Sequence, residues 1–331
     1  MRLLAKFAFL LALLVATASG AWAADGRILD YEGDVRVNGQ PITPNTVLHR
    51  DDTIITADGA SARIILSDNS VLDLESGTEI KLSDYTYEPA APAENKSEVS
   101  LVEGSLRYVS GLIARENPEN VSFKAGNATI GVRGSFTAIA IAGTVVDVEA
   151  MIGEATFEQK GEEIIVPTGK TTQTDPVTGE VLVVPATSSD KVNAVVRAIA
   201  AISPDANDPE DEGCSRGENP LRDTANPDVD PEDVEAIEQM LAELTEGELI
   251  MVIAVLSNNA RHLCIDSLTI ASTITLIARV NPDAVDSVID VADHQLDVVA
   301  RSEIDEHAQK HHGIHAPRDG HHEAPPGKRQ G

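Results

Sequence analysis

The sequence contains few aromatic residues and no excess of basic ones. Phe, Trp and Tyr make up 3% of the 331 residues, so Val, Ile, Leu and Ala must build most of the hydrophobic core. The formal net charge is −29. Nucleic acids and anionic membrane surfaces repel a protein with this charge, so neither is expected as a partner. The length allows about two domains, and the acidic balance weakly favours cationic partners.

Cysteine is also scarce, because the chain contains only Cys214 and Cys264. An even number of cysteines in an exported protein favours a disulfide bond. Such a bond would join an acidic segment to a helical one. Two separate thiols are the alternative.

Long hydrophobic runs are absent after the N-terminus. The best run, Leu249–Leu256, is far shorter than the ~20 apolar residues of a membrane helix. Residues 1–23 have the pattern of a secretory signal peptide, with a positive start, a short apolar stretch and the cleavage-site sequence AWA that ends at Ala23. We expect removal after Ala23 and a periplasmic or secreted protein without a transmembrane segment. An uncleaved membrane anchor is the alternative.

Residues 24–186 are predicted to form an all-β domain. Val35 and Val37 alternate with polar residues, and the turn sequence Asn38-Gly39 follows them. Further short runs rich in Val and Ile are separated by glycine-containing turns at nearly regular spacing. This pattern is typical of a sandwich, a barrel or a roll, and the regular spacing also fits a solenoid-like stack of strands.

The hydrophobic period changes after the predicted β domain. Val192, Val195 and Ile199 lie at helical spacing, and Pro231 is predicted to begin a second helical stretch. The rest of the chain is therefore divided into a helix at 187–203, an acidic linker at 204–230, an α-helical domain at 231–303 and a disordered, His-rich tail at 304–331.

A glycine-rich stretch at 124–143, KAGNATIGVRGSFTAIAIAG, raises the question of a phosphate-binding loop. Gly126 and Gly131 have the spacing of such a loop. The Lys and the Ser or Thr that the loop needs next are replaced by Val132 and Arg133. Strand formers follow, whereas a phosphate loop opens a helix. A phosphate site is therefore not expected.

The same stretch is better interpreted as a corner between two short β-strands. Gly126, Gly131 and Gly134 would permit positive φ angles or the close approach of a neighbouring strand. Arg133 is expected to brace the corner by pairing with an acid or with backbone carbonyl groups. Contact of Arg133 with a ligand or partner is the alternative.

Several segments, taken in order, resemble the FecR-domain family. The segment NATIGVRGSFTAI resembles the family's A-T-I-G-V-R-G-T signature, with Ser135 in place of the usual threonine. It is preceded by GDVRVNGQPITPNTVLHRDDTIITADGASARIILSDNSVLDL and by LVEGSLRYVSG, and it is followed by VEAMIGEATFEQKGEEIIVPTGKTTQT. The resemblance covers about residues 30–175.

This resemblance implies an all-β, roll-like domain outside the cytoplasm that binds proteins or ligands. Members of the family regulate iron uptake by joining a cytoplasmic anti-sigma segment and one membrane helix to this domain, which receives a signal from a TonB-dependent receptor. This sequence has a predicted signal peptide in place of both segments. We therefore expect a periplasmic recognition domain that does not carry a signal across the membrane by itself.

The remaining motifs do not favour a catalytic or metal centre. In HAQKH at 307–311, Ala308 replaces the Glu of a zinc protease. No G-x-S-x-G nucleophile motif occurs, and no cofactor is expected. Imidazole groups of the tail are weak candidates for binding Zn²⁺, Cu²⁺ or Ni²⁺, namely His307, His311, His312, His315, His321 and His322.

The sequence thus predicts a non-catalytic protein that binds an envelope protein, a peptide or a glycan in a sensing or regulatory role. Exposed strand edges would recognise such a partner by strand addition. A structural or scaffolding protein of the cell envelope is the first alternative. A hydrolase with carboxylates in a cleft of the helical domain is the second. The ligand and the oligomeric state are left open.

Overall fold

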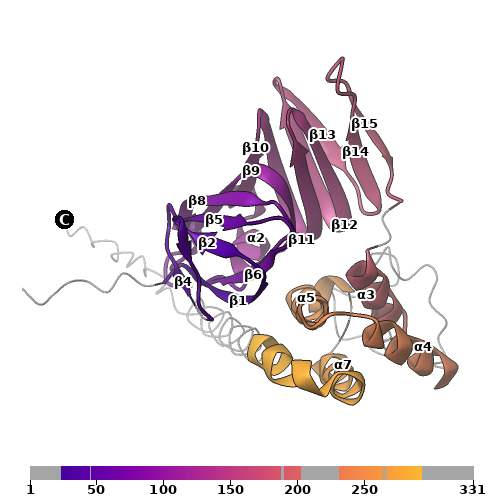
Figure 1. The fold of residues 1–331 in the computed structure, drawn as a ribbon. Helices are drawn as coiled ribbons and strands as arrows, with labels where there is room; N and C mark the ends of the chain where they lie inside the picture. Colours follow the sequence, from indigo (N-terminus) through magenta and orange to yellow (C-terminus); the bar gives the residue numbers. More distant parts are fainter. Residues whose placement is uncertain are drawn as a thin grey trace, which may run out of the picture.

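The computed structural model describes residues 24–44, 46–187, 190–202, 231–263, 265 and 267–292. Within them, strands occupy the sequence up to Pro185 and helices follow (Figure 1). The prediction of a mainly β N-terminal region followed by helices is therefore confirmed. The predicted signal peptide, the acidic linker, the His-rich tail and both cysteines lie outside the described residues.

The described part of the β region contains short and long strands. They are β1 (Gly26–Glu32), β2 (Val35–Val37), β3 (Gln40–Pro41), β4 (Val47–Leu48), β5 (Thr53–Thr56), β6 (Ser61–Leu66), β7 (Val71–Leu74), β8 (Glu79–Thr86), β9 (Lys96–Val109), β10 (Val121–Ala125), β11 (Ala128–Ala142), β12 (Val145–Gln159), β13 (Glu162–Val166), β14 (Lys170–Thr174) and β15 (Val181–Pro185). The short helix α2 (Leu112–Glu116) lies between β9 and β10 in the sequence.

These strands form one mostly antiparallel sheet that branches at β9. The first half of β9 pairs with β8 and, in parallel, with β10, whereas its second half pairs with β7 and β11. From β7 the sheet continues through β6 and β1 to β4, and from β8 it continues through β5 and β2 to β3. The roll- or solenoid-like part of the prediction is not confirmed, because pairing between strands distant in sequence builds the sheet.

Side chains of β6 are buried on both faces of the sheet. Ala62 and Ile64 belong to a core that the curved strands and α2 enclose, whereas Ile65 belongs to a second core that includes the helices (Figure 1). This difference follows from the two-residue period of a strand, which sends successive side chains to opposite faces. The sheet therefore has one face that it covers itself and one that helices cover.

Helix α5 (Glu246–Asn258) is the centre of the helical part. Every side chain from Leu249 to Leu256 is at most 1% exposed, as expected for a helix that is apolar all round. It packs against β7, β9 and β11 on one side and against neighbouring helices on the other. The other helices are α3 (Lys191–Ile202), α4 (Pro231–Ala242), α6 (Ala260–Leu263) and α7 (Ser267–Val280), and residues 285–292 are also helical.

Candidate functional site

A row of alternating charges crosses the face of the sheet that the helices cover. Asp30 of β1 lies opposite Arg63 of β6 in the strand register. Arg63 lies opposite Asp73 of β7, and Asp73 lies opposite Arg107 of β9. Opposite residues of an antiparallel pair point to the same face, so these four side chains lie side by side. We call them the charge row.

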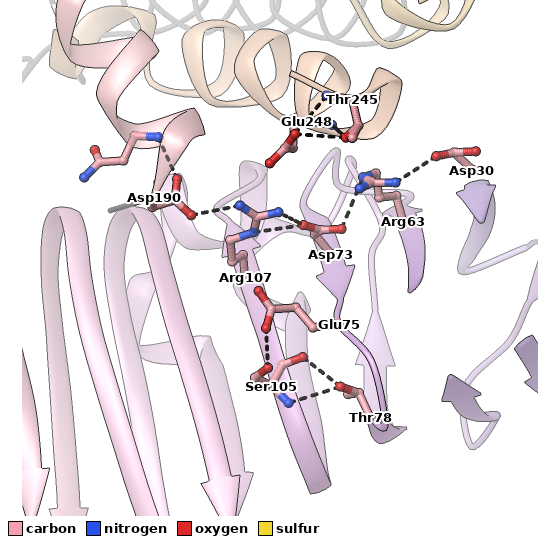
Figure 2. Close-up of polar contacts among 11 residues, drawn as sticks. Asp30, Arg63, Asp73, Glu75, Thr78, Ser105, Arg107, Asp190, Thr245 and Glu248 are labelled. Carbon is pink, nitrogen blue, oxygen red and sulfur yellow. Dashed lines mark hydrogen bonds and ion pairs between the residues drawn. The ribbon is translucent and has the colours of Figure 1, made fainter. Parts of the chain in front are cut away.

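Ion pairs connect the members of the charge row (Figure 2). Arg63 Nη1 lies 2.8 Å from Asp30 Oδ2, and Arg63 Nε lies 3.2 Å from Asp73 Oδ1. Arg107 Nε donates to Asp73 Oδ2 at 2.9 Å, and Arg107 Nη2 contacts the same oxygen. The Asp73 side chain is at the centre of the row and is 2% exposed.

Asp190 connects the charge row to helix α3. Arg107 Nη1 donates to Asp190 Oδ2 at 2.8 Å, while Asp190 Oδ1 accepts a hydrogen bond from Asn193 N at 2.7 Å. The latter bond satisfies one of the N–H groups that the start of a helix leaves free. A single carboxylate therefore caps a helix and binds an arginine of the sheet.

The first turn of α5 lies against the other arginine of the row. A Cβ atom built on Gly247 would be 1.6 Å from Cζ of Arg63, so glycine leaves the space that the guanidinium group occupies. A capping box fixes the start of this helix, because Glu248 N donates to Thr245 Oγ1 and Thr245 N donates to Glu248 Oε2 (Figure 2).

Burial shifts the pKa values of charged groups in the row toward their neutral forms, and the neighbouring opposite charges counteract this shift. Burial raises the pKa of Asp73, although the charges of Arg107 and Arg63 partly oppose this shift. Burial alone would lower the pKa of Arg107, but the carboxylates of Asp73 and Asp190 raise it above its ordinary value. These carboxylates are occupied by guanidinium groups and covered by helices. The charge row therefore positions the helices on the sheet and is not arranged to act on a ligand.

Gly126 and Gly131 of the glycine-rich stretch satisfy different constraints. Gly126 has φ +56° and begins the two-residue turn between β10 and β11. Gly131 lies opposite Thr156 of β12, and a Cβ atom there would be 2.5 Å from Thr156 Oγ1. The first glycine thus permits a positive φ, and the second permits the close approach of a neighbouring strand.

The predicted corner between two strands was wrong, because residues 128–142 form the single strand β11. The register with β12 shifts between Arg133 and Ser135, which places Gly134 in a β-bulge. Arg133 is exposed and lies opposite Glu154, and its side chain has no hydrogen-bond or ion-pair partner among the described residues. The bracing or ligand-binding role of Arg133 stays a prediction.

At the opposite end of the sheet, β13, β14 and β15 extend away from the helices (Figure 1). Apolar side chains are exposed here, namely Ile165 (52% exposed), Val177 (90%), Leu182 (54%) and Val183 (38%). Strand β15 pairs with β14 and with no other described strand, so its second edge is unpaired. We call this unpaired side of residues 181–185 the open edge.

Threonine hydroxyls hold β14 beside β12 where the ladder between these strands ends. The ladder itself contains two residue pairs. Beyond them, Thr172 Oγ1 accepts a hydrogen bond from Val148 N at 2.8 Å, and Thr174 Oγ1 donates to Val146 O at 2.8 Å. The hairpin of β14 and β15 is therefore tied to the sheet while its outer edge stays free.

A cavity of about 480 Å³ lies among the turns at the tips of these strands. Its lining includes Gly126, Gly143 and Lys160 together with the turn between β14 and β15. The Asp175 carboxylate of that turn accepts hydrogen bonds from two N–H groups of its own turn, at 2.8 and 2.7 Å. The cavity has the size of a small-molecule site, but this carboxylate is already used within its own turn.

A comparison with known protein families matches residues 52–156 to the FecR protein family. The chain contains a FecR domain. The resemblance drawn from the sequence is thereby confirmed. The matched residues run from just before β5 into β12, so the FecR domain includes Arg63, Asp73 and Arg107 of the charge row. Asp190, helices α3 to α7 and the open edge lie outside the matched residues.

Two solved structures of a candidate anti-sigma factor from Parabacteroides distasonis ATCC 8503 are similar to part of the chain, each at 17% sequence identity. Each alignment covers 44% of this chain and 64% of that protein, less than two thirds of its length. The TM-scores are 0.35 and 0.34, and a likeness this distant carries no conclusion about the FecR domain's function. No curated protein matches the chain at a significant level.

The predicted metal and disulfide residues lie outside the described part of the chain, and both predictions remain untested. Within the described ranges, no three or more His, Cys, Asp or Glu side chains are grouped to hold a metal ion. No helix in these ranges is long and apolar enough to cross a membrane.

The sequence analysis missed the charge row, although the sequence contains a signal for it. Arg63 in ARIIL, Asp73 in VLDL and Arg107 in SLRYV each interrupt an apolar strand. Charged residues are seldom buried unless they are paired. Opposite charges in neighbouring apolar strands therefore indicate mutual pairing, and the three residues belong to one FecR domain.

Proposed function

We propose that this protein is a non-catalytic recognition protein of the cell envelope, which binds an envelope protein, a peptide or a glycan in a sensing or regulatory role. The observation that carries the proposal is the FecR match over residues 52–156. As the family resemblance implies, such a domain serves regulation through binding rather than chemistry.

The distribution of exposed groups supports a binding role. The carboxylates and guanidinium groups of the charge row pair with one another and, through Asp190, with the start of helix α3. The strands beyond the FecR match instead present apolar side chains and an unpaired edge. An unpaired strand edge flanked by exposed apolar side chains is a ready template for pairing with another chain.

A periplasmic or secreted location is part of this proposal. It rests on the signal-peptide pattern of residues 1–23, with its positive start and its AWA sequence. Edman sequencing of the protein purified from the periplasm tests it, and we expect Ala24 as the first residue. Recovery of the intact N-terminus in the membrane fraction would contradict it.

Affinity capture from envelope extract tests the function itself. The full mature chain serves as bait, and an unrelated protein of similar negative charge is the control for purely electrostatic capture. We expect one protein, peptide or glycan to be retained saturably by the mature chain alone. Recovery of only polymer or matrix components would favour a scaffolding role. Turnover of an envelope substrate without a stable partner would contradict both roles.

A further inference from the structure

The hydrogen bonds at the two ends of β15 determine which of its backbone groups face outward. Asp175 N donates to Glu180 O at 2.8 Å, and Ala186 N donates to Gly169 O at 2.9 Å. In an antiparallel ladder such bonded pairs recur at every second residue. The register between these two pairs has no shift, so Leu182 and Val184 also bond to β14.

Val181 and Val183 therefore direct their N–H and C=O groups away from β14. Pro185 occupies the next outward position, where a strand can accept a residue without an N–H group. The position of this proline agrees with the assignment obtained from the two terminal bonds. The open edge thus offers two complete donor–acceptor sets and one additional carbonyl group.

The side chains of β15 do not protect this edge in the usual way. Natural edge strands are commonly guarded by charged residues, by proline or by a bulge. Residues 181–185 contain no charged side chain, and Pro185 guards only one end. Leu182 is 54% exposed and Val183 is 38% exposed. An added strand would cover apolar surface and pair backbone groups at the same time.

We propose that the open edge of β15 binds an extended peptide segment of a partner protein by strand addition. The segment carries apolar residues at alternate positions and basic residues beside them. Asp175 and Glu180 precede the edge, while Lys170 lies opposite Pro185 and Lys160 lies beside Gly179. The charges next to the edge are therefore mixed, and it is the formal net charge of −29 on the whole chain that favours a basic segment. This inference rests on the proposed binding function and identifies its site and its ligand class.

A second copy of this chain fits the same edge less well. Two molecules with this net charge repel each other. In a two-fold pairing centred on Val183, Val181 of each copy would lie opposite Pro185 of the other. Each such pair lacks one N–H donor, so two ladder bonds would be lost in this register. A pairing centred on Leu182 would keep the bonds between Val181 and Val183 of the two copies, but it would still bring two strongly negative molecules together.

Substitution Val183→Pro tests the proposal because it removes an outward N–H group and leaves the bonds to β14 intact. Ile165→Ser is the matched control, because it removes an exposed apolar side chain from β13 and does not touch the edge. Melting curves of both variants confirm that they are folded. The probe is a random-peptide display library selected on the full mature chain.

We expect the wild type to enrich peptides with alternating apolar residues and flanking Lys or Arg. The enriched peptides should bind Val183→Pro at least about tenfold more weakly and Ile165→Ser within about twofold of the wild type. If Val183→Pro lowers the melting temperature, amide exchange on the wild type replaces it. The bound peptide should then slow exchange at Val181 and Val183 at least about tenfold.

Three results would overturn strand addition. The first is that the wild type enriches no peptides, and the second is that the enriched peptides bind Val183→Pro as tightly as the wild type. The third is a wild-type dimer in sedimentation that Val183→Pro dissociates, because the occupant of the edge would then be a second copy of the chain. Envelope capture separates this inference from the proposed function. Equal capture by wild type and Val183→Pro leaves the function standing and rejects the site, whereas no saturable capture by the wild type rejects the function.

Discussion

The two ends of the sheet each depart from the usual rule of buried apolar and exposed charged side chains. One end buries charged side chains, and the other exposes apolar ones. At β6, β7 and β9, which we call the covered end, charged side chains lie largely buried beneath helices. At β13–β15, which we call the open end, apolar side chains are exposed. Proteins normally bury apolar groups and expose charged ones. The first reversal is compensated within the chain by ion pairing. The second has no compensation among the described residues. Single apolar side chains such as Val102 of β9 are exposed elsewhere, so we assign recognition to that end because β15 also has an unpaired edge.

The largest effect should come from removing the arginine that joins the charge row to helix α3. Arg107→Met leaves Asp73 and Asp190 without their shared cation in a buried setting, so we expect a loss of about 3–5 kcal/mol in the free energy of unfolding. Urea denaturation followed by circular dichroism measures it.

Arg36→Met is the control for this substitution, because Arg36 pairs with Asp34 at an exposed site. Exposed pairs contribute about 0–1 kcal/mol, so this variant should be nearly as stable as the wild type. Equal losses for the two arginines would show that the covered end is not held by its buried charges.

Gly247→Ala should loosen the same end by a steric route. The added methyl group would overlap the Arg63 guanidinium, which Asp30 and Asp73 hold in place. Overpacking typically costs about 1–3 kcal/mol, and the higher helix propensity of alanine returns up to about 1 kcal/mol. Thermal melting measures the balance. A rise in melting temperature would mean that Arg63 moves away freely and that α5 does not depend on this contact.

Asp68→Asn should show that a buried carboxylate near the covered end makes the free energy of unfolding depend on pH. Asp68 is fully buried and accepts hydrogen bonds from Ser70 and Tyr85, and the adjacent Asn69 O accepts one from Asn258 of α5. Burial raises the pKa of Asp68. The folded protein then binds a proton more readily than the unfolded chain. Protonated Asp68 therefore stabilises the folded protein at low pH. This contribution falls as the pH rises from about 4 through the raised pKa of Asp68.

The variant cannot ionise, so its loss relative to wild type, about 1–3 kcal/mol, should be largest at acidic pH and should shrink as pH rises. Urea denaturation at a series of pH values measures this trend. Asp175→Asn is the opposite control, because hydrogen bonds from backbone N–H groups lower the pKa of Asp175. Its effect should grow as pH rises. A loss at Asp68→Asn that is independent of pH would contradict the account.

The smallest global effect should come from the open end. Thr172→Val removes the hydroxyl that accepts the Val148 N–H group and thereby loosens the hairpin of β14 and β15. Because this hairpin is attached at the end of the sheet, we expect local opening and a change of less than about 1 kcal/mol in global stability. Faster amide exchange in β14 and β15, without a matching change in β6 and β7, is the expected result. Equal acceleration in all four strands would show that both ends unfold together.

Local sequence patterns predicted the local structure well. The turn Asn38-Gly39 has φ angles of 51° and 76°, as the type I′ turn of such a hairpin requires. Helix α4 begins at Pro231, where proline is favoured at the first helical position. In both cases the deciding interactions lie within a few residues of each other.

Interactions between distant residues could not be predicted in this way. The glycines of β11 suggested a break, but Gly131 accommodates Thr156 of a neighbouring strand within one continuous element. The charge row requires the register of four strands that are far apart in the sequence. The open edge likewise depends on which strand lies at the end of the sheet. The apolar pattern of residues 181–184 predicts a strand, but it does not show that this strand is the last one in the sheet.

Residue-resolved amide hydrogen exchange on the free mature chain tests the central claim, that β15 has an open edge, most directly. We predict alternation along this strand, with slow exchange at Leu182 and Val184, which bond to β14, and fast exchange at Val181 and Val183, which face outward. Equal protection of all four amides would contradict the account, because it would show that the chain itself already covers this edge.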